Sequence, residues 1–267
     1  MNINFLKYRK IYFVFSGILV ILSIVSLVAF GLNWGIDFKG GSILEVKYKD
    51  IRPSNQEIEK SLEGIDLGVI SVQPTEEKGV IIRTKDINEE THQKVLRKLR
   101  ESSDLEELRF ESIGPVIGKE LTQKTQLLIL ISSLIILIYI ALAFGRIQRP
   151  MKSWQYGLVT SLVALFHDVL IPLGAFALLG KFYGTQVTIP IVAALLTVLG
   201  YSVNDTVVIF DRIRENLLRR EGVTFEETVN KSLNQVVVRS INISLVSILV
   251  LLAIFFFGGA TLKDFSL

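Results

Sequence analysis

The stretch IYFVFSGILVILSIVSLVAFGL, residues 11–32, decides the class of this protein. It contains no charged side chain, and its length matches the ~30 Å hydrocarbon core of a bilayer, which about 20 helical residues cross. Lys7, Arg9 and Lys10 precede it. A secretory signal peptide also begins with basic residues, but its apolar region has only about 7–15 residues and a small-residue cleavage site follows it. We therefore expect an uncleaved membrane anchor.

Charges are segregated along the whole chain. Of the 267 residues, 21% are charged and 50% are hydrophobic, yet several further long stretches contain no Asp, Glu, Lys or Arg. They predict four more membrane helices, at about 126–144, 156–179, 187–210 and 240–257. This pattern excludes a disordered chain and an ordinary soluble enzyme. The absence of cysteine excludes disulfides and thiol chemistry, and a net charge of +3 gives no reason to expect a nucleic-acid partner.

The basic residues between the predicted helices indicate an orientation. They precede the first helix and fill the links between the second and third and between the fourth and fifth, whereas Lys181 is the only charge between the third and fourth. The basic residues of the two later links are Arg146, Arg149 and Lys152, then Arg212, Arg214, Arg219, Arg220 and Lys231. Because cytoplasmic loops carry excess Lys and Arg, we expect a cytoplasmic N-terminus. Residues 1–32 then hold the first span, 33–124 an external domain, and 125–267 the other spans.

The external segment has the pattern of a small α+β domain. Residues 41–48 alternate apolar and polar as in a half-buried strand, and Ser54 with Glu57 forms a capping box at the start of a helix. Strands are expected at 68–73, 79–84 and 105–112, with a second helix at 88–101 that buries Val95, Leu96 and Leu99. The order β-α-β-β-α-β predicts a ferredoxin-like fold.

GPVIGKE, residues 114–120, is a weak candidate for a phosphate-binding loop. That motif requires four residues between its glycines and Ser or Thr after the Lys, whereas this segment has three residues and then Glu. We interpret it as a Gly-Pro turn before the second span. The spans also lack a zinc-binding H-E-x-x-H and a convincing serine–histidine pair, so we expect no catalytic residue, no cofactor and no metal.

Ionisable residues inside the apolar helices are the candidate functional residues. They are His167 and Asp168 in the third span, Asp205 in the fourth, and Arg239 at the start of the fifth. A charge at membrane depth costs several kcal/mol unless it is paired or hydrated, so each residue is a functional candidate. His167 and Asp168 are expected about 15 Å into their helix, near the middle of the membrane. A pairing of Asp205 with Arg239 is plausible from their positions.

The fourth span also carries a polar stripe. Thr197, Tyr201 and Asp205 recur every four residues, with Gly200 and Asn204 one row away. Such a stripe on an apolar helix faces other helices or water, and its small members permit close packing. An aspartate in that setting is able to gain and lose protons, which makes Asp205 the leading candidate for a proton relay.

Structural explanations compete for most of these residues. Arg239 fits a snorkelling anchor at a helix end, and His167 with Asp168 fits a static hydrogen-bonded pair between helices. We interpret residues 211–215 as a solvated continuation of the fourth helix. Residues 224–234 are expected to form a capped helix with one apolar face, in which Thr224 and Glu227 make the capping box.

Three segments resemble the SecD/SecF family of protein-export membrane subunits, within the resistance–nodulation–division superfamily. They are WGIDFKGGS after the first span, FHDVLIPLG in the third, and GYSVNDTVVIFDRIREN at 200–216, and the match is to SecF in particular. The resemblance covers nearly the whole chain. It implies that Asp205 is the family's required aspartate, that Arg239 is its associated arginine, and that Gly200, Tyr201, Asn204 and Thr206 support the motif.

The resemblance also implies partners and a location. They are SecD, the SecYEG channel, an exported polypeptide and the lipid bilayer of a prokaryotic inner membrane, with protons as the coupling ion. The family has six spans, whereas this sequence stops in TLKDFSL where the sixth is expected, which suggests a shortened chain. Two other hypotheses remain open: a passive scaffold subunit, and a proton-coupled small-molecule exporter of the same superfamily.

Overall fold

The computed structural model describes residues 3–75, 78–143, 153–219, 221–258 and 265–266. The basic link that contains Arg146, Arg149 and Lys152 therefore lies outside the described residues. So do Arg220 and most of the segment before the expected sixth span. The chain divides into two compact units. The helical unit holds Met1–Asn33, Leu128–Thr185 and Pro190–Leu267, and the sheet unit holds Trp34–Leu127 with Gln186–Ile189.

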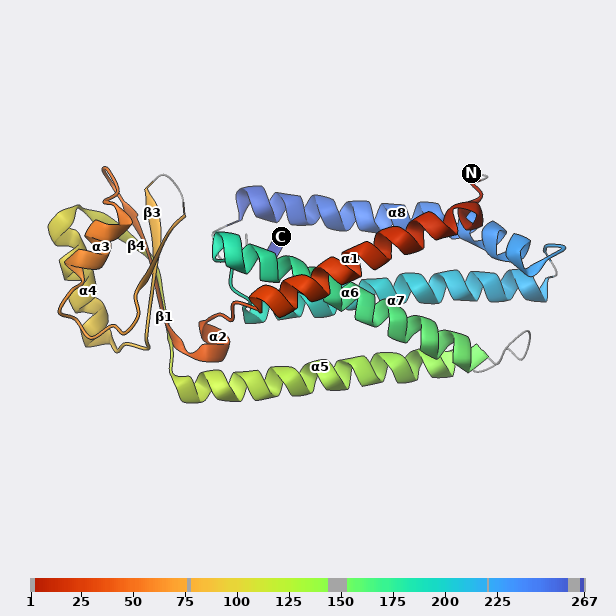
Figure 1. Cartoon of the computed structure of the whole chain (residues 1–267), viewed down its shortest axis with the longest axis horizontal. Coiled ribbons are helices and arrows are strands. Elements are labelled where there is room, and N and C mark those ends of the chain that lie inside the picture. Colours follow the sequence, from red (N-terminus) through yellow and green to blue (C-terminus); the bar gives the residue numbers. More distant parts are fainter. Residues whose placement is uncertain (1–2, 76–77, 144–152, 220, 259–264, 267) are drawn as a thin grey trace. The chain divides into compact units, whose positions relative to one another are not determined.

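The sheet unit has the ferredoxin-like topology expected from the sequence. Its described elements are α2 (Ile36–Lys39), β1 (Gly41–Tyr48), α3 (Asn55–Ser61), β2 (Ser71–Pro74), β3 (Gly79–Thr84), α4 (Glu89–Ser102) and β4 (Leu105–Ile113). The strands lie in the order β2-β3-β1-β4, and every neighbouring pair is antiparallel. Helices α3 and α4 cover one face of this sheet (Figure 1). The capping box of Ser54 and Glu57 is confirmed at the start of α3.

One hydrophobic core holds the sheet unit together. Alternate residues of β1, namely Leu44, Val46 and Tyr48, point toward the helices and are almost fully buried. The predicted face of α4 is confirmed, because Val95, Leu96 and Leu99 are each at most 2% exposed. The other members of this core are Ile58, Leu62, Leu67, Val80, Ile82 and Leu105. Burial of these side chains supplies most of the stabilising free energy of the unit.

The structure corrects one strand and adds one buried residue. The strand predicted at 68–73 begins only at Ser71, because Gly68 has a positive φ of 67° and turns the chain. The ring of His92, on the buried face of α4, stacks on Phe110 at a centroid distance of 3.7 Å. A shift in register between Glu45 and Val46 turns both Glu107 and Phe110 toward this helix. Oxygen atoms of Glu89 and Glu107 each lie 3.2 Å from a ring nitrogen of His92.

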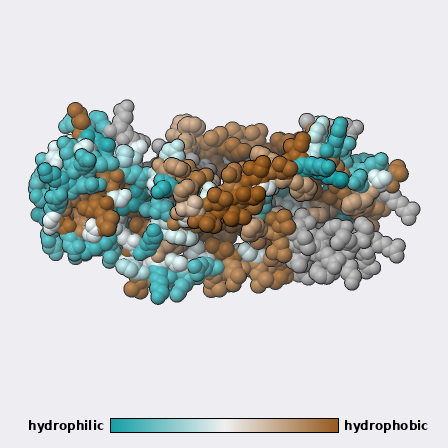
Figure 2. Space-filling model, in the orientation of Figure 1, coloured by the Kyte–Doolittle hydropathy of each residue, from teal (hydrophilic) through white to brown (hydrophobic). Residues whose placement is uncertain are grey.

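The membrane helices that the sequence predicts lie mainly in the helical unit. The long helices of the chain are α1 (Arg9–Phe30), α5 (Pro115–Ala143), α6 (Ser153–Tyr183), α7 (Ile189–Leu218) and α8 (Phe225–Phe257), after a short 3-10 helix η1 (Phe5–Tyr8). Within the described residues, these are five helices long and apolar enough to cross a membrane. Figure 2 shows apolar side chains gathered over the helices, whereas the sheet unit is mostly hydrophilic.

Two helix boundaries carry information about the links. Helix α5 begins at Pro115, directly after Gly114, so GPVIGKE is the start of a helix and does not wrap a phosphate. Proline suits the first helical position because it has no N–H to leave unpaired. The predicted segments 224–234 and 240–257 are one continuous helix, α8, which begins at the expected capping box of Thr224 and Glu227.

Candidate functional site

Asp168 lies at the centre of a hydrogen-bond network inside the helical unit. Its Oδ1 atom lies 2.8 Å from Nδ1 of His167, the preceding residue on α6. Its other oxygen accepts a hydrogen bond from the Ser202 hydroxyl of α7. The Asp168 side chain is 22% exposed and the His167 side chain 35% exposed. The contact between His167 and Asp168 lies within α6, and the bond from Ser202 joins Asp168 to a second membrane helix.

The backbone around Asp168 is unusual as well. Pro172 lies inside α6, four residues after Asp168. A proline has no N–H, so it is unable to make the helical hydrogen bond to the carbonyl oxygen of Asp168. This leaves the carbonyl open to another donor, beside a carboxylate that already has two polar neighbours. The backbone carbonyl and the side-chain carboxylate of Asp168 are therefore two hydrogen-bond acceptors at the same point of α6.

Asp205 lies on α7 between two differently exposed rows of side chains. It follows Ser202 by three residues and Tyr201 by four, and residues at these spacings are neighbours on a helix surface. Ser202 bonds to α6, whereas the side chain of Tyr201 is 53% exposed. Asp205 itself is half-buried. It therefore lies within one helical turn of the Asp168 network, at the edge of the exposed stripe.

The structure does not bring Asp205 and Arg239 together. Both residues are described, and no ion pair within 4.0 Å joins them; Arg239 is exposed. The contact of Asn216 with Ser232, at 2.8 Å, sets the register of α7 against α8. Counted from this contact, Asp205 is about four residues farther along the helix axis than Arg239, or roughly 6 Å. The pairing expected from the sequence is thus absent from this arrangement of the described helices.

The polar stripe of α7 faces away from the described helices. Thr197, Gly200, Tyr201 and Asn204 are exposed, and they lie at spacings that share one helix face. A Cβ atom built at Gly200 would meet no described heavy atom within 4 Å. Thr206, on the following row, is half-buried. The stripe therefore offers a row of small and polar side chains with open space in front of it.

Ser202 is the site residue that sequence reasoning missed. Ser202 is not ionisable and does not belong to the four-residue repeat of Thr197, Tyr201 and Asp205. A signal was nevertheless present, because Ser202 is a hydroxyl residue three positions before Asp205 in an apolar helix. In such helices, serine commonly bonds across to a neighbouring helix.

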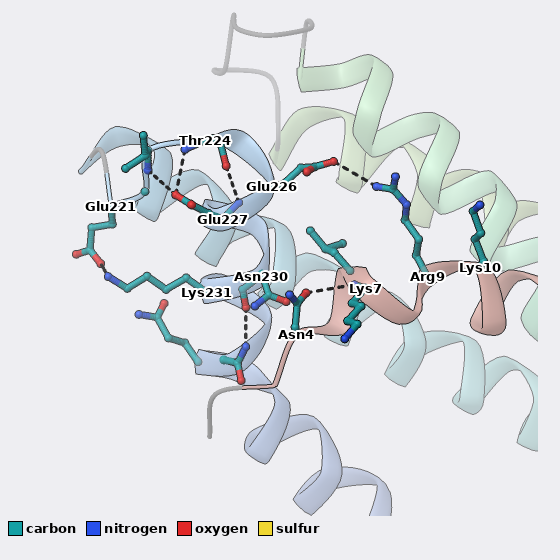
Figure 3. Close-up of a pocket in the computed structure, with 15 residues that line it drawn as sticks. Asn4, Lys7, Arg9, Lys10, Glu221, Thr224, Glu226, Glu227, Asn230 and Lys231 are labelled. Atoms are coloured by element: carbon teal, nitrogen blue, oxygen red, sulfur yellow. Dashed lines mark hydrogen bonds and ion pairs between the residues drawn. The ribbon is translucent and has the colours of Figure 1, made fainter.

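A separate polar cavity of about 1310 Å³ lies where the N-terminal segment meets the start of α8. Figure 3 shows charged side chains around it, with Arg9 paired to Glu226 and Lys231 to Glu221. The Asn234 side chain accepts a hydrogen bond from the Ile3 N–H at 2.8 Å and donates one to the Ile3 carbonyl at 2.7 Å. These hydrogen bonds hold the start of the chain against α8 beside the cavity.

Metal-ligand geometry gives no further candidate. In the described part of the chain, no group of three His, Cys, Asp or Glu residues is placed to hold a metal ion. The side chains that meet in the helical unit are a carboxylate, an imidazole and a hydroxyl, together with the nearby Asp205.

Known proteins identify the family. The model of "Protein export membrane protein SecD/SecF, C-terminal" matches residues 92–267, and that of the "SecD/SecF GG Motif" matches residues 25–50. The chain belongs to the SecD/SecF family of protein-export membrane proteins. It is 39% identical to the SecF translocase subunit of Thermobaculum terrenum, over 99% of this chain and 86% of that one. The SecF subunit of a Synechocystis species is 35% identical, over 100% and 87%.

Solved structures of SecDF share this fold. The translocon-associated SecDF of Thermus thermophilus matches all of this chain with a TM-score of 0.83 and 30% sequence identity. SecDF in a super-membrane-facing form matches it with a TM-score of 0.66 and 32% identity. The chain covers 35% of each of those longer chains. It is thus a multi-pass membrane protein with the fold of one part of SecDF.

Proposed function

We propose that this chain is the SecF-type auxiliary subunit of the Sec protein translocase and uses the proton-motive force to promote protein export. Membership of the SecD/SecF family and the SecF translocase subunits among its relatives support the first part. The proton coupling rests on one observation: the carboxylate of Asp168 is bonded between two membrane helices, with Asp205 one turn away on α7.

Proton uptake at these carboxylates supplies a direct way to move α7. When Asp168 is ionised, it accepts the hydrogen bond from Ser202 that ties α6 to α7. Protonation removes the charge and weakens this bond, because hydrogen bonds to ionised groups are roughly twice as strong as neutral ones. Protonation of Asp205 changes the charge of α7 as well, one helical turn from Ser202. Release of the tie allows α7 to shift between two positions.

The available energy is sufficient for such a switch. One charge that crosses a potential of 100 mV releases about 2.3 kcal/mol. A nearly complete shift between two states requires about 5.5 kcal/mol. At this potential two protons supply about 4.6 kcal/mol and three supply about 6.9 kcal/mol, so three protons per cycle supply enough free energy.

The exposed stripe of α7 suggests where a partner binds. Thr197, Gly200, Tyr201 and Asn204 leave a row of small and polar groups uncovered by the described helices. Polar groups in lipid are costly, and small residues are typical of helix contacts in membranes. SecD, joined to a SecF-like part in the solved SecDF chains, is the partner that we propose for this face. Association with SecYEG and an exported polypeptide follows from the same role.

The proposed location is the cell membrane of a prokaryote, with the N-terminus in the cytoplasm. The basic residues at 7–10 and in the α7–α8 link support this orientation by the positive-inside rule. The sheet unit, which follows α1, then lies outside the membrane on the far side. There it is placed to hold or release an emerging polypeptide.

The test is Asp205→Asn in membrane vesicles that carry SecD and SecYEG. We expect export driven by the proton gradient to fall to the level seen without a gradient, while the subunits still purify together. Asp211→Asn is the matched control, since Asp211 lies farther along α7 with a side chain that is 67% exposed. Unchanged gradient-driven export by Asp205→Asn would show that the proton-coupled proposal is wrong.

A passive scaffold is the second candidate, because the Ser202–Asp168 bond also fits a contact that only packs two helices together. Hydrogen bonds between membrane helices commonly serve packing alone. A scaffold predicts that Ser202→Ala and Asp205→Asn change export only as far as they reduce the amount of assembled complex. Export per assembled complex, compared with and without the gradient, separates the two candidates.

A further inference from the structure

The chain that follows α1 is joined to the link between α6 and α7. The N–H of Gly35 donates a hydrogen bond to the carbonyl of Val187 at 2.8 Å, and Trp34 forms a parallel β-bridge with the same residue. Val187 is 1% exposed. All of these residues belong to the sheet unit, together with Ile189, the first residue of α7. The segment 34–41 therefore contacts the start of the helix that carries Asp205.

Glycine makes this contact possible. A Cβ atom at position 35 would lie 2.9 Å from the Cγ2 atom of Thr188 and 3.1 Å from the carbonyl oxygen of Val187. Any larger residue would push the two segments apart. Gly40 and Gly41 then turn the chain into β1 with φ angles of 76° and 130°, which other residues rarely adopt. The glycines of WGIDFKGG thus serve a close crossing of backbone segments.

Asp37 binds the first N–H group of α7. Its Oδ2 atom accepts a hydrogen bond from the Ile189 N–H at 2.9 Å, across 152 residues of sequence. The next residue is Pro190, which has no N–H of its own. A carboxylate at a helix N-terminus satisfies an otherwise unpaired donor and interacts favourably with the positive end of the helix dipole. Asp37 is therefore the cap of α7, supplied by another segment.

The same link is tied to the sheet. Gln186 accepts a hydrogen bond from Nε of Arg83 on β3 at 3.1 Å, and the Arg83 guanidinium also donates to Gln73 on β2 at 2.7 Å. Two independent contacts, at Gln186 and at Ile189, thus fasten both ends of a four-residue segment. The residues that lead into α7 are thus held by hydrogen bonds to residues of the sheet unit.

We propose that Asp37 is a positioning residue that transmits movement of α7 to the sheet unit, with the 34–41 segment as the joint. This inference rests on the proposed function, because it assumes that α7 moves when its carboxylates take up protons. The cap holds the first turn of α7 to the segment that leads into β1. Without the cap, α7 still gains and loses protons, but its movement is not passed to the domain that handles the polypeptide.

Asp37→Ala and Asp37→Asn form the decisive pair. Asparagine also caps helices well, whereas alanine does not. In the full chain with SecD and SecYEG, we expect hydrogen exchange at the first turn of α7 to rise about fivefold in Asp37→Ala, the factor that corresponds to one lost cap. Gradient-driven export should fall to the Asp205→Asn level. Asp37→Asn should restore both protection and most of the export.

A second variant tests the joint without changing the cap. Gln186→Ala removes the acceptor for Arg83 and leaves the Asp37 contact in place. We expect a partial loss of gradient-driven export with normal exchange at Ile189. Asp66→Ala is the control for loss of a carboxylate in the same unit, since the Asp66 side chain is 88% exposed, and its export should match the unaltered chain.

Each outcome decides one of the two proposals. Normal export by Asp37→Ala, despite faster hydrogen exchange at the first turn of α7, would overturn the proposed role of Asp37. Equal losses of gradient-driven export in Asp37→Ala and Asp37→Asn would also overturn it. The negative charge of Asp37 would then matter, and its capping hydrogen bond would not. An infrared titration should find the Asp205 carboxyl band unchanged in Asp37→Ala. If Asp205→Asn exports normally while Asp37→Ala does not, proton coupling fails and the mechanical role of Asp37 stands.

Discussion

At the scale of single residues, the Ser202–Asp168 contact carries most of the site. Ser202 donates to a carboxylate that also contacts His167, so one hydroxyl links α7 to a polar pair on α6. Hydrogen bonds between membrane helices contribute about 0.6 kcal/mol on average and up to about 1.7 kcal/mol. Because this acceptor is a carboxylate, we expect a value toward the upper end of that range.

Ser202→Ala should therefore lower the free energy of unfolding by about 1–1.7 kcal/mol in detergent micelles. Denaturant titration followed by tryptophan fluorescence measures this change. Ser247→Ala serves as a control, because the Ser247 hydroxyl donates its hydrogen bond within α8, to the Ile243 carbonyl. Equal effects of the two substitutions would argue against a specific tie between α6 and α7.

A capping residue gives a second prediction, on pH. Hydrogen bonds from the backbone N–H and then the hydroxyl of Ser54 lower the pKa of Glu57 below its usual value of 4.5. A carboxyl whose pKa is lower in the folded state stabilises that state at neutral pH, and this contribution is lost as the pH falls through the folded pKa. Helix α3 should therefore loosen below about pH 4.5.

Hydrogen exchange of α3 at pH 7 and pH 4, corrected for the intrinsic rates, measures this loosening. Glu57→Gln keeps a side chain that suits a capping box but does not titrate. We expect the variant to lose the pH dependence of protection at the start of α3. An identical pH dependence in the variant and the unaltered chain would assign the effect to other carboxyl groups.

The sequence predicted contacts correctly where both partners lie within one helical turn. Ser54 with Glu57 and Thr224 with Glu227 formed the expected boxes, because a cap depends on residues within one turn. It missed Ser202, which has no charge to attract notice, and Asp37, whose partner is 152 residues away. It also paired Asp205 with Arg239, since sequence spacing does not give the register between helices.

At the scale of elements, the crossing of α1 and α6 depends on small side chains. A Cβ atom at Gly174 would clash with the Cα and Cβ atoms of Ser23. Ser23 and Ser26 are buried at 6% and 5% exposure on the facing helix. Close approach of this kind is how membrane helices associate in the absence of a hydrophobic driving force.

Gly174→Ala should lower the free energy of unfolding by about 1–3 kcal/mol, as expected when a packed contact is overfilled. Gly17→Ala is the matched control on α1, because a Cβ atom there meets no heavy atom within 4 Å. In the control, alanine should be neutral or slightly stabilising, since it favours helix more than glycine does. Thermal unfolding of both variants in the same detergent compares them, and similar losses would contradict the close crossing.

Element boundaries followed the sequence where periodicity was strong. The alternation in 41–48 gave β1 with its observed bounds, and charge-free runs located the membrane helices. The start of β2 differed because a positive φ at Gly68 is a property of the folded turn. The continuity of α8 was missed because polar residues such as Arg239 interrupt its apolar pattern without breaking its backbone.

At the scale of the whole molecule, the two units differ in what stabilises them. The sheet unit has a closed core from α3, α4 and the sheet, whereas the long helices expose apolar side chains that suit lipid. We therefore expect residues 34–127 to fold alone in water, which circular dichroism and a single cooperative transition in urea would show. The absence of a cooperative transition would mean that this unit needs the helices or Gln186–Ile189 to fold.

In the proposed function, carboxylates within the membrane helices bind and release the protons that drive export. Infrared difference spectroscopy of the full chain with SecD, titrated across neutral pH with isotope-labelled aspartate, measures this directly. We predict a carboxyl band that appears on acidification and is lost in Asp205→Asn but kept in Asp211→Asn. A spectrum with the same aspartate band in Asp205→Asn as in the unaltered chain would contradict the assignment of proton binding to Asp205.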